Sequence, residues 1–160
     1  MLIEKKLQIL AAAPDLLEDL LAEIPAEMLK ERRIPGKWSI HEHAVHLEEA
    51  QKMIIERFKR FQLEPNPVFE PYLPGNTVPD DYLADLDLQQ SLADFRLHRK
   101  EMVDLLSTFT EAQWTNTGSH PEYRSISALL WIRHVMMHDH LHMYRIEELW
   151  LTTPAYLRKA

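Results

Sequence analysis

The sequence predicts an all-α protein that folds as a four-helix bundle. Proline and glycine leave three long uninterrupted stretches, at residues 37–64, 80–117 and 122–153, and a shorter one at 14–24. A proline inside a helix costs about 3 kcal/mol, so stretches without one favour long helices. The chain has 160 residues, the usual length of one domain, and no pair of β-strands is indicated. We therefore expect residues 1–160 to form a single bundle.

The first helix is predicted over residues 14–24, where leucines recur at helical spacing. Pro14 suits the first position of a helix, because the N–H that it lacks would have no partner there. A short separate helix is expected before it, near residues 2–12. The N-terminal region is thus expected to contain two helices that meet at this proline.

The second helix is predicted over residues 39–62 and the third over 87–108. Ser39 precedes an apolar run and Glu42 follows three residues later, a pattern that is typical of a capping box at a helix start. The third helix has one continuous stripe at helical spacing, formed by Leu88, Leu92, Phe95, Arg99, Met102 and Leu106. Each helix therefore has one face that is suited to burial in the bundle.

The fourth helix is predicted over residues 125–151, with Ser125 or Ser127 at its start and Pro154 beyond its end. Between the second and third helices, residues 63–80 contain five of the ten prolines. This segment is interpreted as an extended surface crossover. The alternative interpretation is a lid or a dimer arm, because long ordered loops often have a function.

The composition excludes several classes of protein. The chain has 18 basic and 25 acidic residues, so its net charge of −7 disfavours nucleic-acid binding. There is no cysteine, so any metal must be bound by histidine and carboxylate side chains. No apolar stretch reaches about 18 residues, so no membrane span is expected. The apolar N-terminal run is short and follows Glu4, which disfavours a signal peptide and favours the cytoplasm.

Histidines supply the main functional signal. Seven of the nine fall in two short windows, at His41, His43, His46, His134, His138, His140 and His142. On the fourth helix, His138 lies in the middle of the apolar face, with His134 and His142 about 40° to either side. His140 points the opposite way and is expected to be solvated. The i, i+4 pair His138 and His142 can reach one ion, as in helical zinc sites.

The second helix offers candidates for a third ligand. His43 lies within its apolar stripe, His46 lies at the flank and His41 is well off it, so helical periodicity leaves His43 and His46 both open. Helices in a bundle are about 8–10 Å apart, so an inward histidine can meet the pair on the fourth helix. Glu42 and Glu49 are candidates to orient His46 or to accept a proton, and the alternative is that both are solvated surface residues.

The order of these motifs resembles the DinB/YfiT-like superfamily. The residues that carry the resemblance are Lys37-Trp38-Ser39-Ile40, His46-Leu47, His138-Asp139, His142 and Ile146. It spans residues 14–151 and implies an up-up-down-down bundle with a long crossover between the second and third helices. It also implies that His46, His138 and His142 bind a divalent metal. Arg145 stands where the family often has glutamine, so this candidate site residue bears on substrate choice.

The resemblance implies chemistry but does not fix the reaction. A metal bound by three neutral imidazoles has coordination positions open for substrate. The expected ion is zinc or nickel, with iron or manganese as alternatives, because all four accept imidazole ligands. Family members include transferases that use low-molecular-weight thiols as well as proposed hydrolases. We expect a metal-dependent transferase that uses such a thiol on a small molecule. The alternatives are a metal-dependent hydrolase and a non-enzymatic binding or stress-response module with a structural metal.

The resemblance also implies a homodimer, because family members often pair through helices of the bundle. Apolar residues near the C-terminus are candidates for the contact surface. They are Trp150, Leu151, Tyr156 and Leu157.

Overall fold

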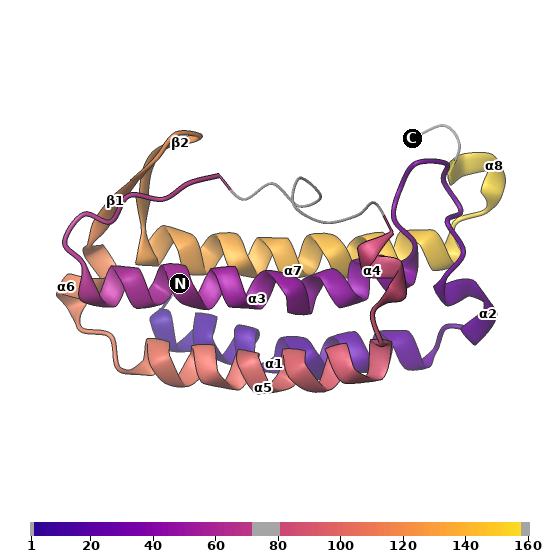
Figure 1. Ribbon diagram of the computed structural model, residues 1–160. Coiled ribbons are helices and arrows are strands. Elements are labelled where there is room, and N and C mark those ends of the chain that lie inside the picture. Colours follow the sequence, from indigo (N-terminus) through magenta and orange to yellow (C-terminus); the bar gives the residue numbers. More distant parts are fainter. Residues whose placement is uncertain (1, 72–80, 158–160) are drawn as a thin grey trace.

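The computed structural model describes residues 2–71 and 81–157, and it confirms the four-helix bundle (Figure 1). The long helices are α1 (Ile3–Ala22), α3 (Ile40–Leu63), α5 (Leu88–Ser107) and α7 (Ala128–Leu151). Short helices are α2 (Ala26–Leu29), α4 (Tyr82–Asp85), α6 (Glu111–Thr115) and α8 (Pro154–Leu157). A hairpin of β1 (Thr117–His120) and β2 (Tyr123–Ser127) precedes α7. No helix in the described parts of the chain combines the length and apolarity needed to cross a membrane.

Three of the long helices, α3, α5 and α7, start close to where the sequence predicts, because a side chain caps each of them. The Ser39 side chain accepts from the Glu42 N–H, and the Glu42 side chain accepts from the Ser39 N–H, which completes the predicted capping box. Asp87 caps α5. Ser127, one of the two predicted starts, caps α7. The second, third and fourth helices therefore agree with the prediction to within a few residues.

The helices run in the order up-down-down-up, which differs from the expected up-up-down-down. Contacts of Glu48 with His98 and of Gln62 with Thr108 show that α3 and α5 are parallel. The connection between these two helices must therefore cross the length of the bundle, which confirms the long crossover. The connection from α1 to α3 turns back at one end of the bundle instead (Figure 1). The lid interpretation of residues 63–80 stays a prediction, because residues 72–80 lie outside the described residues.

The prediction of two N-terminal helices that meet at Pro14 is wrong. α1 runs continuously from Ile3 to Ala22 with Pro14 inside it. Pro14 has no N–H to donate to the Leu10 carbonyl one turn earlier. That oxygen has another donor instead, because Nη1 of Arg99 on α5 lies 3.4 Å from it. The tertiary contact thus offsets part of the cost of a proline in the helix.

The absence of a strand pair is also a wrong prediction. β1 and β2 are antiparallel, with Gly118 opposite Ile126, and Ser119 also bridges to Val68 of the crossover. A Cβ on Gly118 would lie 2.5 Å from the Pro67 carbonyl oxygen, so this close approach requires glycine. These strands have only four and five residues, which is too short for a clear alternating pattern.

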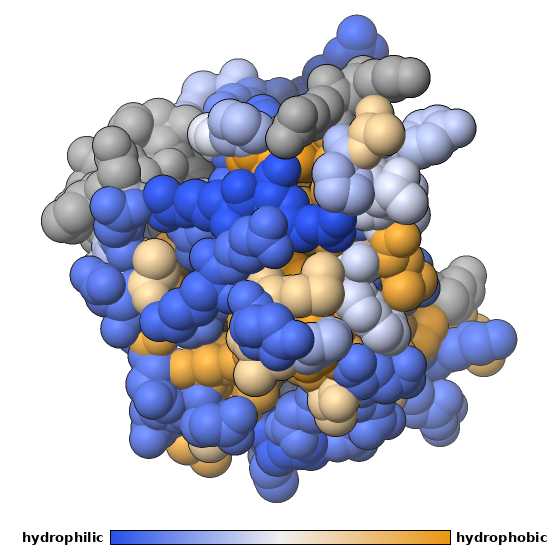
Figure 2. Space-filling model, turned by 90° about the vertical axis from the view of Figure 1, so that its right-hand side faces the viewer, coloured by the Kyte–Doolittle hydropathy of each residue, from blue (hydrophilic) through white to orange (hydrophobic). Residues whose placement is uncertain are grey.

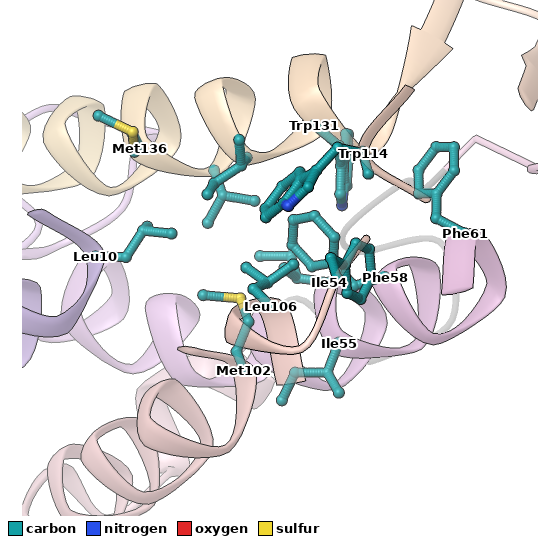
Figure 3. Close-up of a cluster of buried hydrophobic side chains, with 14 of the residues drawn as sticks. Leu10, Ile54, Ile55, Phe58, Phe61, Met102, Leu106, Trp114, Trp131 and Met136 are labelled. Carbon is teal, nitrogen blue, oxygen red and sulfur yellow. The ribbon is translucent and has the colours of Figure 1, made fainter. Parts of the chain in front are cut away.

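The apolar core forms two clusters along the bundle axis. Figure 3 shows one of them, in which Phe58 of α3, Met102 of α5 and Trp131 of α7 come together. The other cluster lies towards the opposite end and contains Leu17, among others. On α5, a polar position lies between the clusters, because Arg99 falls between Phe95 of one cluster and Met102 of the other. On α7, Asp139 lies between the clusters in the same way.

A buried ion pair occupies this layer between the clusters. Arg99 and Asp139 are each only 1% exposed, and they are joined by two hydrogen bonds of 2.5 and 3.1 Å. The Nε–H group of Arg99 donates to Gln51, 3.2 Å away, in addition to the contact with Leu10. One guanidinium group therefore connects all four long helices.

The expected dimer surface is only partly exposed. Leu151 is 60% exposed and Tyr156 is 70% exposed, but Leu157 is only 2% exposed because α8 folds back on the protein. Trp150 is partly buried against the second cluster. Figure 2 shows this end of the molecule with hydrophobic residues in separate areas among hydrophilic ones. Leu157 is thus excluded from the predicted surface.

We predict that Asp139→Asn lowers the free energy of unfolding of the metal-free protein by about 3–5 kcal/mol, because it leaves Arg99 buried without its counter-charge. Urea denaturation measures this. The double variant Arg99→Met/Asp139→Leu should recover much of the loss. Lys100→Ala removes an exposed ion pair with Asp104 and should change stability by less than about 1 kcal/mol. An equal loss in Asp139→Asn and Lys100→Ala would contradict the prediction.

Candidate metal centre

The structure brings together the three histidines to which the resemblance pointed. His46 lies on α3, and His138 and His142 lie one turn apart on α7, which packs antiparallel to α3. One ring nitrogen of each histidine lies within 4.8 Å of the corresponding nitrogens of the other two. His46 Nε2 is 3.2 Å from His138 Nε2. His43, which periodicity left open, does not belong to this group among the described residues.

The geometry of the group suits a divalent ion. Bonds of about 2.0–2.1 Å in a tetrahedral arrangement place two ligand nitrogens about 3.4 Å apart. The distance of 3.2 Å between His46 and His138 is close to this value. In addition, Nδ1 of His138 is buried and has no hydrogen-bond partner among the described residues, so the contact with His46 is the one hydrogen-bonding contact of this ring there. Three converging imidazoles thus fit a metal better than they fit a structural network.

Burial keeps these histidines neutral. Burial lowers the pKa of His46 to about 3, with a further decrease from the nearby His138 and His43. Burial likewise lowers the pKa of His142 to about 2, and His138 and His46 add to the effect. The pKa of His138 is also lowered, mainly by burial. At neutral pH no proton has to leave before these nitrogens can bind an ion.

Two further aromatic residues contact the group. His43 Nδ1 lies 2.9 Å from His142 Nδ1, a contact that orients the His142 ring. The Trp38 ring packs on His46, with ring centroids 4.7 Å apart, and stacks on His142 at 5.9 Å. No sequence pattern indicated Trp38 as a site residue. Its position directly before the Ser39 cap was the available signal.

The remaining histidines lie apart from the group. His134 stacks on Trp131, with centroids 4.7 Å apart and the rings nearly parallel. His140 is exposed, as predicted, and its Nδ1 lies 2.6 Å from the Met136 carbonyl oxygen. His41 is buried, and its nearby backbone partners are in and after α4. The prediction that His134 faces the core is wrong, because its side chain is exposed beside Trp131, where it lines the first cavity without joining the three histidines.

The candidate acid–base residues have other contacts. Glu42 is buried in the capping box and binds Arg32 through both oxygens. Burial would raise the pKa of Glu42, but hydrogen bonds from Arg32 and Ser39 outweigh burial and lower it to about 2. Glu49 accepts from the Tyr82 hydroxyl group, 3.1 Å away. The roles proposed for Glu42 and Glu49 at His46 stay predictions.

One cavity borders the histidine group, and a second lies beside the two residues that contact it. One has a volume of about 190 Å³ and is lined at one end by His46 and His138. The other, of about 400 Å³, is lined by His43 and Trp38. Arg145, a candidate site residue, lines this second cavity and forms an ion pair of 2.5 Å with Glu148. The first cavity thus gives access to His46 and His138, whereas His43 and Trp38 separate the second cavity from the three histidines.

Comparison with known proteins agrees with this arrangement. The profile of the DinB superfamily matches residues 9–146. The chain belongs to the DinB superfamily. This DinB-superfamily protein is similar in structure to YfiT from Bacillus subtilis, described as a probable metal-dependent hydrolase with an unusual four-helix bundle topology. The sequence identity is 24% and the TM-score is 0.81, over 91% of this chain and 84% of YfiT, which shows a common fold. No curated protein matches the chain.

We predict that the purified protein binds about one divalent ion per chain. His138→Ala and His142→Ala should each abolish binding, and His46→Ala should weaken it strongly. His43→Leu should weaken binding about 10- to 100-fold without changing the stoichiometry, because it removes only the partner of a ligand. Elemental analysis and competition with a chelator measure these effects. His140→Ala is the matched control, and full occupancy in the double variant His138→Ala/His142→Ala would refute the assignment.

We also predict that the metal-free protein loses stability on acidification below pH 6.5. The folded-state pKa values of His46 and His142 lie below the ordinary value of 6.5, so the unfolded state binds more protons as the pH falls. Between pH 6.5 and 5, each should contribute a loss of up to about 2 kcal/mol. Urea denaturation of the wild type and of His46→Leu tests this. The variant should have the shallower pH dependence, and identical slopes would contradict the prediction.

Proposed function

We propose that this DinB-superfamily protein is a metal-dependent enzyme that acts on a small molecule. The observation that carries the proposal is the convergence of nitrogens from His46, His138 and His142 at the end of a cavity of about 190 Å³. Zinc or nickel is the proposed ion, with iron or manganese as alternatives, because all four accept imidazole. A cavity of this size suits a small metabolite, since pockets for drug-sized ligands are about 300–1,000 Å³.

The three histidines would hold the ion with its charge intact. Neutral imidazoles cancel none of the +2 charge, and three ligands leave room for a further one. When bound, such an ion lowers the pKa of a coordinated thiol or water and so supplies a nucleophile at neutral pH. His43 and Trp38 would keep the His142 and His46 rings in place on the side away from the first cavity.

The nucleophile that we propose is a low-molecular-weight thiol, which would attack an electrophilic small molecule. The first cavity, which His46 and His138 line, would receive the small molecule, and a thiol held by the ion would lie beside it. Metal-dependent hydrolysis is the second candidate, and the description of YfiT as a probable metal-dependent hydrolase supports it. A purely structural metal, the non-enzymatic alternative, would have no need of cavities beside it.

A panel of thiols and of esters and amides separates these functions. We predict that metal-loaded protein conjugates at least one thiol with a generic electrophile such as chlorodinitrobenzene, and that metal-free protein does not. The His142→Ala variant should match the metal-free protein, and His140→Ala should match the wild type. Metal-dependent ester hydrolysis without any thiol conjugation would instead establish the hydrolase. Inactivity of the metal-loaded protein in both assays would favour the non-enzymatic module.

A homodimer is proposed on the basis of the exposed Leu151 and Tyr156 near the C-terminus. We predict a dimer in light scattering at micromolar concentration. Leu151→Glu should shift it towards a monomer, because the introduced charge would be buried in the contact. The control is Leu97→Glu, since Leu97 is similarly exposed, at 62%, on α5. A monomeric wild type would refute the proposal.

A further inference from the structure

Arg57 is a buried cation in the wall of the first cavity. It is only 7% exposed and lines the cavity that His46 and His138 border at the metal end. Its Nη2 donates to the Glu70 carbonyl oxygen, 2.6 Å away, and its guanidinium lies 4.7 Å from the Trp131 ring centroid. Within the described residues it forms no ion pair with a carboxylate. A buried charge is costly when it has no counter-charge.

The surroundings of Arg57 are mixed in charge. Glu122, at the turn of the hairpin, also lines the cavity and is exposed, and its charge acts on Arg57 without forming an ion pair. His120 and His134 face the same cavity. Burial lowers the pKa of both histidines, and the charge of Arg57 lowers it further, so neither adds a positive charge at neutral pH. The fixed cation of this cavity is therefore Arg57.

We propose that Arg57 binds a carboxylate group of the substrate while the reacting group lies at the three histidines. This inference rests on the proposed function, because it names the class of substrate for the same site. A planar guanidinium can bind a carboxylate through two parallel hydrogen bonds, which a buried position strengthens. His46 and Arg57 lie eleven residues apart on α3, about 16 Å along the helix axis. This is the separation of the two backbone positions, and both side chains reach one cavity of about 190 Å³. The substrate is thus a small molecule that has a carboxylate in addition to its reacting group.

A structural role for Arg57 is the rival explanation, and Arg60 provides a matched comparison. Both guanidinium groups lie over the Phe69 ring, at 5.6 Å for Arg57 and 5.0 Å for Arg60, and both donate to a carbonyl of the crossover. Arg60 forms an ion pair with Glu64, however, and does not line the cavity. Of these two arginines, only Arg57 contacts Phe69 and a crossover carbonyl and still has N–H groups without a carboxylate partner among the described residues.

The test uses the full-length protein loaded with cobalt and a series of ω-mercaptocarboxylates of increasing chain length. The controls are ω-mercaptoalcohols of the same chain lengths, which lack the negative charge. The thiolate-to-cobalt absorption band measures the binding of each acid and each alcohol. At one chain length, the carboxylate should bind about ten- to hundredfold more tightly than the alcohol. Arg57→Gln should remove this preference without changing the affinity for the alcohol, and Arg60→Gln should preserve it. Should Arg57→Gln fail to fold, Arg57→Lys should retain a reduced preference.

Two results would overturn the inference. One is equal affinity for carboxylate and alcohol at every chain length in the wild type. The other is a preference that survives in Arg57→Gln. An experiment on metal-free protein separates this inference from the proposed function. In calorimetry, the metal-free protein should still bind hexanoate more tightly than hexanol, and Arg57→Gln should remove this difference. If no thiol binds the cobalt protein but this dependence is present, the thiol chemistry fails and the carboxylate site stands.

Discussion

The ion pair between Arg99 and Asp139 is the interaction on which the interior of the bundle depends. It lies between two apolar clusters, where neither charge can reach water, so each group must be satisfied by the other and by its neighbours. Arg99 also contacts α1 through Leu10 and α3 through Gln51. A rotation or shift of any long helix would leave a buried polar group unpaired. The ion pair therefore fixes the mutual register of the four helices.

This register also positions the histidines. Asp139 directly precedes an exposed histidine and directly follows His138, and successive residues on a helix are about 100° apart. With Asp139 turned towards α5, His138 is turned towards α3, where it meets His46. Placing several neutral histidines in the interior disfavours their protonation. Buried histidines of this kind contribute little to the stability of the protein. Their presence in the interior is therefore consistent with a functional role.

The first part of the crossover between α3 and α5 supports the wall of the cavity without lining it. This part pairs with β1 through the bridge from Val68 to Ser119, and Phe69 packs in the core. The absence of a side chain at Gly118 allows this close approach. The Glu70 carbonyl oxygen then accepts from Arg57, which fixes the cation at the cavity wall. Segments that are far apart in the sequence thus form one cavity, which contains two of the proposed metal ligands, His46 and His138, as well as the buried cation Arg57.

The sequence by itself determined three of the four long helices and most of the faces they bury, because breakers, caps and 3.6-residue periodicity are local properties. It placed His138 and His142 together and turned His140 outwards for the same reason. It left His43 and His46 both open, and the choice of His46 came from family resemblance. Only the tertiary structure decided the continuity of α1 through Pro14, the hairpin, the helix directions and the partners of Asp139 and Arg57. These features depend on contacts between distant segments, which no local pattern encodes.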